Sequence, residues 1–211
     1  MVASTPSFWF LSRQGQKGKI MLIRKAEASD AAHLVRFINM AADDLPMHFW
    51  RKSVGPEGDA IAYGMERAAR ATGSFSFNNA WLAEVDGAVA ACLLGYPAED
   101  DPSPIAPDTP PVFVPLLELE ALAPGSWYLN VLATYESHRG QGCGSALLAK
   151  AEAITRATGR KTISLITADT HHDAQRLYAA KGYVDIARRL VVKGDWQVDA
   201  SEWILMTKTL A

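Results

Sequence analysis

The sequence predicts one α/β domain with a mixed sheet. Three observations lead to this fold class. Apolar segments with the patterning of strands alternate with segments whose apolar residues recur at helical spacing. The pair Asp86-Gly87 joins two apolar segments in mid-chain, which is a strong hairpin signal. The 211 residues, 49% of them hydrophobic, are enough to bury a sizeable core.

The N-terminal part predicts a strand followed by two helices. Residues 20–26 have strand patterning, and Ser29 or Asp30 is expected to cap the helix that follows. A second helix is expected over 58–73. The aromatic-bearing segment 45–57, which lies between the two helices, is expected to be a loop.

The middle of the chain predicts a hairpin and then a long loop. Two strands joined by the Asp-Gly turn are expected over 80–97. Seven of the 11 prolines lie within 97–115, and this density excludes both a helix and an interior strand. We therefore expect a Pro-rich loop over 97–115.

The C-terminal half alternates strands and helices before it ends in two strands. The expected elements are a strand, a helix, a strand, a helix and two strands, over 127–134, 145–159, 161–169, 173–182, 183–192 and 202–210. The whole chain thus gives about seven strands and about four helices. We expect residues 1–20 to be a poorly ordered extension and 21–211 to form the single domain.

Charge and cysteine content argue against several function classes. With 21 basic and 23 acidic residues, the chain has no electrostatic footprint for nucleic acid or an anionic membrane, so neither is expected as a partner. No apolar run is long enough to span a membrane. The two cysteines, Cys92 and Cys143, provide neither a disulfide framework nor a four-cysteine zinc site. A reducing cytoplasm fits this content best.

The most informative segment is glycine-rich and lies between a predicted strand and a predicted helix. A helix N-terminus leaves its first amide groups unpaired at the positive end of the macrodipole, so a bare backbone there can bind an anion. Gly140, Gly142 and Gly144 provide such a backbone, while Arg139 adds a fixed charge and Ser145 a hydroxyl. A phosphate or pyrophosphate is the expected ligand.

Spacing rules out two common phosphate motifs. The segment has no glycine followed by lysine and then a hydroxyl residue, as a P-loop requires. The dinucleotide fingerprint fails because Ser145 and Leu147 stand where its third glycine would be. A purely structural glycine turn remains an alternative to an anion site.

Beyond the glycines, the segment resembles the acyl-CoA-binding motif of the GNAT superfamily of N-acyltransferases, [R/Q]-x-x-G-x-G/A. Arg139, Gly142 and Gly144 fill that motif. A second signature of the family, an alanine, a leucine-tyrosine pair and a glycine-aromatic pair, is matched around Leu177-Tyr178 and Gly182-Tyr183. The motifs cover 127–183, and together they are more specific than either alone.

The resemblance implies a GNAT-like fold, a mostly antiparallel sheet in which strand 127–134 splays away from strand 161–168. It also implies acetyl-CoA as co-substrate, bound largely through the backbone. The cofactor-binding residues that it implies are Leu132, Ala133, Thr134, Arg139, Gly140, Gln141, Gly142, Cys143, Gly144, Ser145 and His171. Relatives often carry asparagine where this chain has His171, so this contact departs from the family pattern. Cys143 is expected to fit a tight loop rather than to act as a nucleophile.

Catalytic roles also follow from the resemblance. The family's counterpart of Tyr178 points at the sulfur, where a phenol can protonate a departing thiolate. Many relatives place a base glutamate at the position of Tyr128, so this chain departs from that pattern. Strand alternation puts Tyr128, Asn130 and Leu132 on one side, and Asn130 is expected to orient a water or the amine. Packing roles remain the alternative for Tyr178 and Asn130.

The acceptor is expected to enter beside the first two helices. Asp43 and Asp44 would attract an ammonium group, Trp50 would offer a face for cation–π contact, and Tyr128 would line the site. Solvated acids and a core aromatic are the alternative. The histidines of residues 169–173 do not require a metal, and none is expected.

The sequence therefore predicts an acetyl-CoA-dependent N-acetyltransferase that acts on a primary amine by direct attack, with a small molecule as the favoured acceptor. The alternatives are a catalytically weak acyl-CoA-binding regulator, a protein or peptide N-acetyltransferase, and a phosphate-ligand module unrelated to acyl transfer. A homodimer is kept among the expected assemblies.

Overall fold

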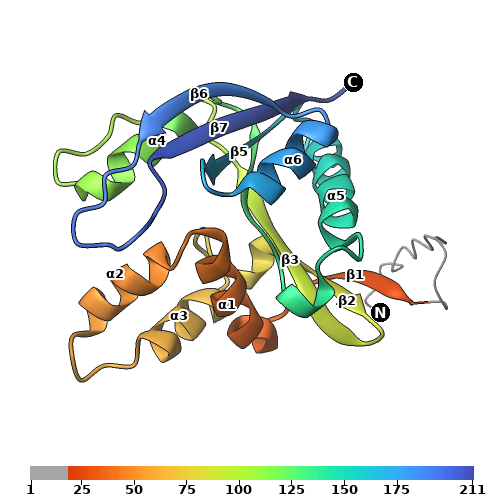
Figure 1. The fold of residues 1–211 in the computed structure, drawn as a ribbon, viewed down its shortest axis with the longest axis horizontal. Coiled ribbons are helices and arrows are strands. Elements are labelled where there is room, and N and C mark those ends of the chain that lie inside the picture. Colours follow the sequence, from red (N-terminus) through yellow and green to blue (C-terminus); the bar gives the residue numbers. More distant parts are fainter. Residues whose placement is uncertain (1–18) are drawn as a thin grey trace, which may run out of the picture. The chain divides into compact units, whose positions relative to one another are not determined.

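The computed structural model describes residues 19–211 and contains a seven-stranded sheet of order β1-β2-β3-β4-β5-β7-β6 (Figure 1). The strands are β1 (Met21–Lys25), β2 (Ala80–Val85), β3 (Ala88–Pro97), β4 (Trp127–Thr134), β5 (Thr162–Ala168), β6 (Val184–Leu190) and β7 (Glu202–Thr209). The α-helices are α1 (Ala31–Ala41), α2 (Leu45–Val54), α3 (Ala60–Ala69), α4 (Val114–Glu120), α5 (Cys143–Ala157) and α6 (His172–Ala180). Short 3-10 turns are η1 (Ala28–Asp30), η2 (Phe77–Asn79), η3 (Pro111–Phe113) and η4 (Glu136–His138).

Most neighbouring strands in the sheet are antiparallel. The strands β1, β2 and β3 pair in this way, as do β5 with β7 and β7 with β6. Backbone bonds from Tyr135 N to Ala90 O and from Ala98 N to Ser126 O show that β3 and β4 also run antiparallel. The pair β4 and β5 is parallel. The prediction of a mixed, mostly antiparallel sheet with about seven strands is confirmed.

The hairpin between β2 and β3 turns where the sequence predicts. Asp86 and Gly87 have φ values of 51° and 83°, which are the left-handed values of a type I′ turn. Val85 and Ala88 face each other across this turn. The two-residue loop therefore sets the register of both strands.

Two helices were missed by the sequence analysis. The segment 45–57, predicted as a loop, contains α2, and the predicted loop 97–115 ends early because α4 begins at Val114. Pro46 and Pro115 lie in the first turns of these helices. Proline is tolerated there because the first amides of a helix have no intrahelical partner anyway. The high proline content of 97–115 was taken to exclude a helix, but a proline in the first turn is compatible with one, as Pro115 shows.

Contacts group the chain into two compact units, one formed by residues up to Leu94 with Val131–Leu147, the other by Gly95–Asn130 with Leu148–Ala211. The boundaries fall inside β3, β4 and α5, so each of these elements contributes to both units. A single domain over 21–211 stays a prediction. Of the predicted extension 1–20, residues 1–18 lie outside the described part of the chain.

In the first unit, α1 packs its apolar face inward as its spacing predicts. Leu34, Phe37 and Ile38 are fully buried. The buried Asn39 side chain donates to Val35 O and accepts from Met47 N, 2.7 Å away, which ties the end of α1 to α2. A buried amide with both ends satisfied fixes the turn between the helices.

In the second unit, α4 packs alongside β6 and β7 (Figure 1). Trp127 at the start of β4 is almost fully buried and lies so close to Gly95 of β3 that a Cβ at Gly95 would overlap its ring. A glycine is therefore required here for close packing. An ion pair between Arg189 of β6 and Glu118 of α4, 2.6 Å long, joins the helix to the sheet edge.

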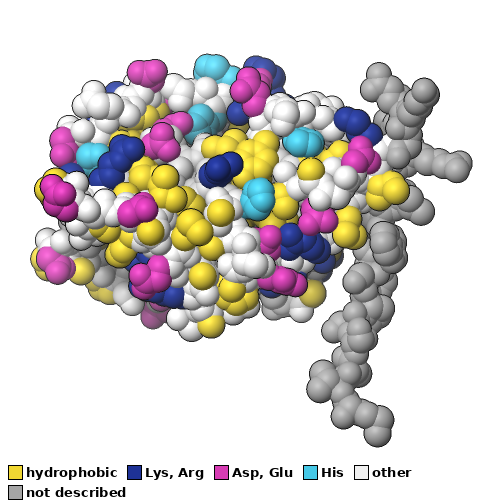
Figure 2. Space-filling model, turned by 90° about the horizontal axis from the view of Figure 1, so that it is seen from below, with side chains coloured by type: hydrophobic (Ala, Val, Ile, Leu, Met, Phe, Trp, Pro, Cys, Tyr) yellow, Lys and Arg dark blue, Asp and Glu magenta, His cyan; other side chains and the backbone are white. Residues whose placement is uncertain are grey.

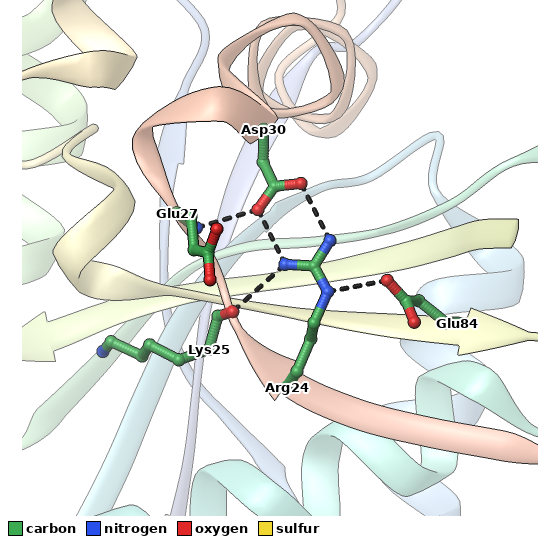
Figure 3. Close-up of polar contacts among 5 residues, drawn as sticks. All are labelled: Arg24, Lys25, Glu27, Asp30 and Glu84. Atoms are coloured by element: carbon green, nitrogen blue, oxygen red, sulfur yellow. Dashed lines mark hydrogen bonds and ion pairs between the residues drawn. The ribbon is translucent and has the colours of Figure 1, made fainter. Parts of the chain in front are cut away.

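A charged cluster links β1 to β2 and η1 in the first unit (Figure 3). Arg24 makes two bonds to the carboxylate of Asp30, at 2.7 and 2.8 Å, and one of 2.6 Å to Glu84. The buried Asp30 also accepts from Glu27 N. The Arg24 guanidinium, followed by the backbone bond from Glu27, holds the pKa of Asp30 below its ordinary value, although burial opposes this.

Replacing Arg24 with Met keeps much of the side-chain stem and removes the charge. We expect the free energy of unfolding at pH 7 to fall by about 2–3 kcal/mol, because Asp30 would be left buried without its cation. Since the pKa of Asp30 is lowered in the folded state, its contribution is present at neutral pH and lost in acid. Urea unfolding should therefore show a smaller difference between the two proteins below about pH 4.

Arg70 provides the matched control, because its ion pair with Glu66 is exposed on both sides. Replacing Arg70 with Met should cost less than about 0.5 kcal/mol. Equal losses for the two variants would show that Arg24 acts only as a surface charge.

Candidate active site

The glycine-rich segment leads directly into α5 within the first unit. Gly140 and Gly142 have φ values of 72° and 84°, which L side chains rarely adopt. Ala146 N donates to Gly142 O, so the helical ladder begins there. The amides of the three residues that start α5 precede this first bond and have no acceptor within the helix. These amides are the donors on which the predicted anion site depends.

The space above this loop is open. A Cβ placed on Gly140 or Gly142 would meet no atom within 4 Å, and Arg139 is exposed beside them. The Gln141 side chain donates to Ser137 O and accepts from the Lys19 ammonium, each at 3.0 Å. Gln141 thus ties the loop to Ser137 and Lys19, while the space beside Gly140 and Gly142 is open and the exposed Arg139 adjoins Gly140 in the chain.

Leu132, Ala133 and Thr134 form the end of β4 in the same unit. Burial alternates along this strand, with Leu132 and Thr134 half-buried and Ala133 buried. The predicted backbone contacts of the cofactor therefore fall on a strand end that is open on one face. The alternation expected for β4 is present over this segment.

Cys143 is buried at the first position of α5, and burial raises the pKa of its thiol. A raised pKa keeps the thiol protonated and unreactive near neutral pH. The structure therefore supports the expectation that Cys143 fits a tight loop. Ser145 and Gly144 are partly exposed in the same turn.

In the second unit, the ladder between β4 and β5 is short. Its pairs run from Trp127 opposite Ile163 to Leu129 opposite Leu165, although both strands are longer. Over its full length β5 instead pairs with β7. The parallel pairing between β4 and β5 is therefore limited to the first three residues of β4.

A polar cluster lies at the end of this short ladder. Tyr128 hydrogen-bonds to Glu120, the last residue of α4, and to Asn130. The Asn130 amide also donates to the hydroxyl of Tyr96 on β3 at 3.5 Å, and the rings of Tyr96 and Tyr128 meet edge to face at 5.7 Å. Asn130 and Tyr128 are thus brought together, as strand alternation predicts, and Glu120 joins them.

Burial sets the protonation behaviour of this cluster. Desolvation raises the pKa of Glu120 to about 7, and the hydrogen bond from Tyr128 opposes that rise. Desolvation first, and then the charge of Glu120, raise the pKa of Tyr128 well above its ordinary value. Near neutral pH, Tyr128 is therefore a neutral donor and Glu120 is poised between its two forms.

Tyr178 lies in α6 of the same unit. It is buried, its ring centroid is 5.8 Å from that of Tyr183, and burial raises the pKa of its phenol. A protonated phenol is what the predicted acid needs. The helix begins at His172, one residue before the predicted start at Asp173. His171 is its N-cap residue, and its side chain makes no capping hydrogen bond.

Three of the predicted acceptor residues, Asp43, Asp44 and Trp50, lie in the first unit, whereas Tyr128 lies in the second. Asp43 and Asp44 have left-handed φ values of 46° and 60° in the tight turn between α1 and α2, and Asp44 is exposed. Trp50 is only 4% exposed and packs against Gly64 of α3. That burial gives the indole a packing role, and its contact with substrate stays a prediction, as it does for Tyr128.

Next to that turn lies an open hollow of about 1020 Å³ formed by α2, α3 and their connection. Its lining includes His48, Arg51, Lys52, Glu57 and Asp59. On the face shown in Figure 2, acidic and basic side chains are scattered among hydrophobic and uncharged ones. This hollow was not predicted, because the segment that forms half of it was expected to be a loop.

Sequence reasoning also missed Glu120. It follows Leu119 in a segment to which no element was assigned, and its partner Tyr128 lies on a different element. A carboxylate within the leucine-rich run 116–122 was the available signal. Such a residue is expected either to find a partner or to shift its pKa.

The sequence matches the model of the acetyltransferase (GNAT) family over residues 39–183. The chain belongs to this family. Membership supports an acyltransferase activity, and the seven-stranded sheet agrees with the fold of the family. No curated protein matches the sequence.

Several solved structures are similar to this chain in fold. One acetyltransferase is 24% identical, with a TM-score of 0.63 and coverage of 90% of this chain and 100% of its own. An N-acetyltransferase from Staphylococcus aureus Mu50 is 18% identical, with a TM-score of 0.64 and coverage of 89% and 100%. The polyamine N-acetyltransferase of Drosophila melanogaster is 16% identical, with a TM-score of 0.62 and coverage of 90% and 100%. At these identities the likeness shows the fold.

Two other features, a membrane-spanning helix and a metal site, are absent from residues 19–211. None of the helices there has the length and apolar character to cross a membrane. Within the same residues, His, Cys, Asp and Glu side chains form no group of three or more that is placed to hold a metal ion.

Burial of both thiols leads to a prediction about their reactivity. Cys92 and Cys143 are 0% and 1% exposed, and burial raises the pKa of each thiol. At pH 7 the native protein should react with far less than one equivalent of Ellman's reagent within minutes, and the denatured protein with two, one for each cysteine. Rapid reaction of one thiol in the native protein would show that its surroundings open readily.

Proposed function

We propose that the protein is an acetyl-CoA-dependent N-acetyltransferase that moves the acetyl group to a primary amine by direct attack. The observation that carries the proposal is the glycine loop at the start of α5, with open space above Gly140 and Gly142, in a chain of the acetyltransferase family. Backbone amides, the helix dipole and Arg139 suit a pyrophosphate in that space. The half-open end of β4 suits an extended pantetheine arm.

Three steps need protein groups. A proton must leave the acceptor ammonium, the oxygen of the attacked thioester carbonyl must be stabilised, and the departing thiolate must be protonated. Tyr178 is proposed as the acid, since burial keeps its phenol protonated at neutral pH. A backbone amide near Leu132 is proposed to stabilise the oxyanion.

A small amine is the favoured acceptor. The turn between α1 and α2 holds two adjacent aspartates in left-handed conformations, and such strained positions are typical of functional sites. Asp44, exposed on that turn, is proposed to attract the ammonium group. A peptide acceptor and a binding protein without turnover are outcomes that the assay separates.

The first experiment measures thiol release from acetyl-CoA with a panel of agmatine, spermidine, tyramine and an N-terminal peptide. Release with a small amine is expected, and release with the peptide alone would assign a protein acceptor. A thermal shift with CoA, but none with ATP or NAD, is expected to accompany it. No shift and no release would overturn the proposal.

Replacing Gly142 with Ala tests the phosphate site. A methyl group there would point into the open space meant for the ligand, so we expect the dissociation constant of CoA, measured by calorimetry, to rise at least about tenfold. The left-handed φ should also cost about 1 kcal/mol of stability. Gly159, which follows α5, has φ 74° and equally open space, so Gly159→Ala is matched in strain. Gly159→Ala should lose similar stability and keep CoA affinity, whereas equal losses of affinity would place the site elsewhere.

Tyr178→Phe tests the proposed acid. The ring and its packing remain, so CoA affinity should be kept while kcat falls by roughly tenfold to a thousandfold. An acyl donor whose thiol leaves readily without protonation should restore most of the rate. A defect that persists with this donor would make Tyr178 a packing residue.

A further inference from the structure

We propose that Glu120, at the end of α4, is the general base of the transfer and takes the proton from the acceptor ammonium, with Tyr128 as the residue that positions its carboxylate. This inference rests on the proposed acetyl transfer. It assigns the base to a helix that the sequence analysis did not detect.

The geometry places the Glu120 carboxylate beside the part of β4 where its pairing with β5 ends. Glu120 is partly exposed and hydrogen-bonded to Tyr128, which lies in the ladder with β5. Asn130, which also bonds to Tyr128, is the first residue beyond that ladder and is half-buried. Glu120 therefore has one neutral donor that holds it and a face that a substrate can reach.

The cations around α4 are engaged with other carboxylates. On β6, Arg189 pairs with Glu118 and Arg188 with Asp185 and Glu202. On β7, Lys208 pairs with Glu152 at 2.6 Å. The segments β5 and η3, which also pack near α4, contain no acidic or basic residue.

This arrangement suits a base rather than a structural ion. A carboxylate that only stabilised the fold would be expected to face a cation, as Glu118 does. Glu120 instead bonds to the hydroxyl of Tyr128, and burial raises its pKa to about 7, near the value that favours general-base catalysis at neutral pH. The cluster thus provides a base without a permanent counter-ion.

The proton balance of the step is as follows. An N–H bond of the ammonium breaks and an O–H bond forms on the Glu120 carboxylate. The freed nitrogen lone pair attacks the thioester carbonyl, and the nitrogen, which becomes positively charged on forming the C–N bond, loses its second proton to water. As the C–S bond breaks, the thiolate takes the phenolic proton of Tyr178. Between turnovers, Glu120 releases its proton to water and Tyr178 regains one from water, so both residues return to their starting forms.

Glu120→Gln is the first test, with Glu118→Gln as a control two residues away on the same helix. The kcat/KM of the best amine in the panel is measured from pH 5.5 to 9 at saturating acetyl-CoA. The unaltered protein should lose rate in acid with an apparent pKa near 7. Glu120→Gln should lower kcat/KM at pH 8 by about a hundredfold or more and abolish that acidic limb. Glu118→Gln should change neither the rate nor the profile.

Tyr128→Phe gives a readout that a purely structural role would not move. The Tyr128 hydrogen bond lowers the pKa of Glu120, so its removal should raise that pKa further and shift the acidic limb to higher pH. The same shift should appear in the carboxyl signal of Glu120 in NMR spectra of ¹³C-labelled protein. An unmoved limb with an unmoved signal would overturn the positioning role.

Calorimetry with CoA separates the two levels of the proposal. If the unaltered protein acetylates no amine, the proposed function and the base fall together. If it does, and folded Glu120→Gln binds CoA and keeps both rate and acidic limb, the base assignment alone is overturned. Should Glu120→Gln fail to fold, Glu120→Asp decides, since a retained carboxylate should preserve an acidic limb at reduced rate, and its full loss would contradict the proposal.

Discussion

The alternation of side chains along β4 is the constraint on which the candidate site depends. This strand belongs to both compact units, carrying Tyr128 and Asn130 in one and Leu132 and Thr134 in the other. Because successive side chains point to opposite faces, Asn130, Leu132 and Thr134 are partly exposed while the residues between them are buried in the core. A shift of register by one residue would bury Asn130 and expose the apolar set.

In the glycine loop the constraint is backbone conformation. The turn into α5 needs left-handed φ values at two positions separated by one residue, and only glycine adopts them without a Cβ penalty. The same lack of side chains leaves the helix amides accessible. Conformational need and ligand access therefore favour the same residue type, which is why a structural turn and an anion site look alike in the sequence.

Local patterns allowed most of the fold to be predicted. All seven strands, the Asp86-Gly87 turn and the glycine loop follow from short-range signals that tertiary contacts did not override. The helix α4 was missed because the prolines of 97–115, Pro115 among them, were taken to exclude a helix, although Pro115 occupies a first turn. The helix α2 was missed because its aromatic-bearing segment was interpreted as a loop between two helices. The link between Glu120 and Tyr128 had no local signal, since it depends on how a helix docks on a strand.

The same docking fixes the position of α4. A seven-residue helix is too short to be stable in isolation, so its position depends on its packing against the strands β6 and β7. The carboxylate at its end is therefore carried by the connection between β3 and β4 rather than by a strand of the sheet. Substitutions in this connection can change the surroundings of Glu120 while the sequences of β4 and of the glycine turn are left unchanged.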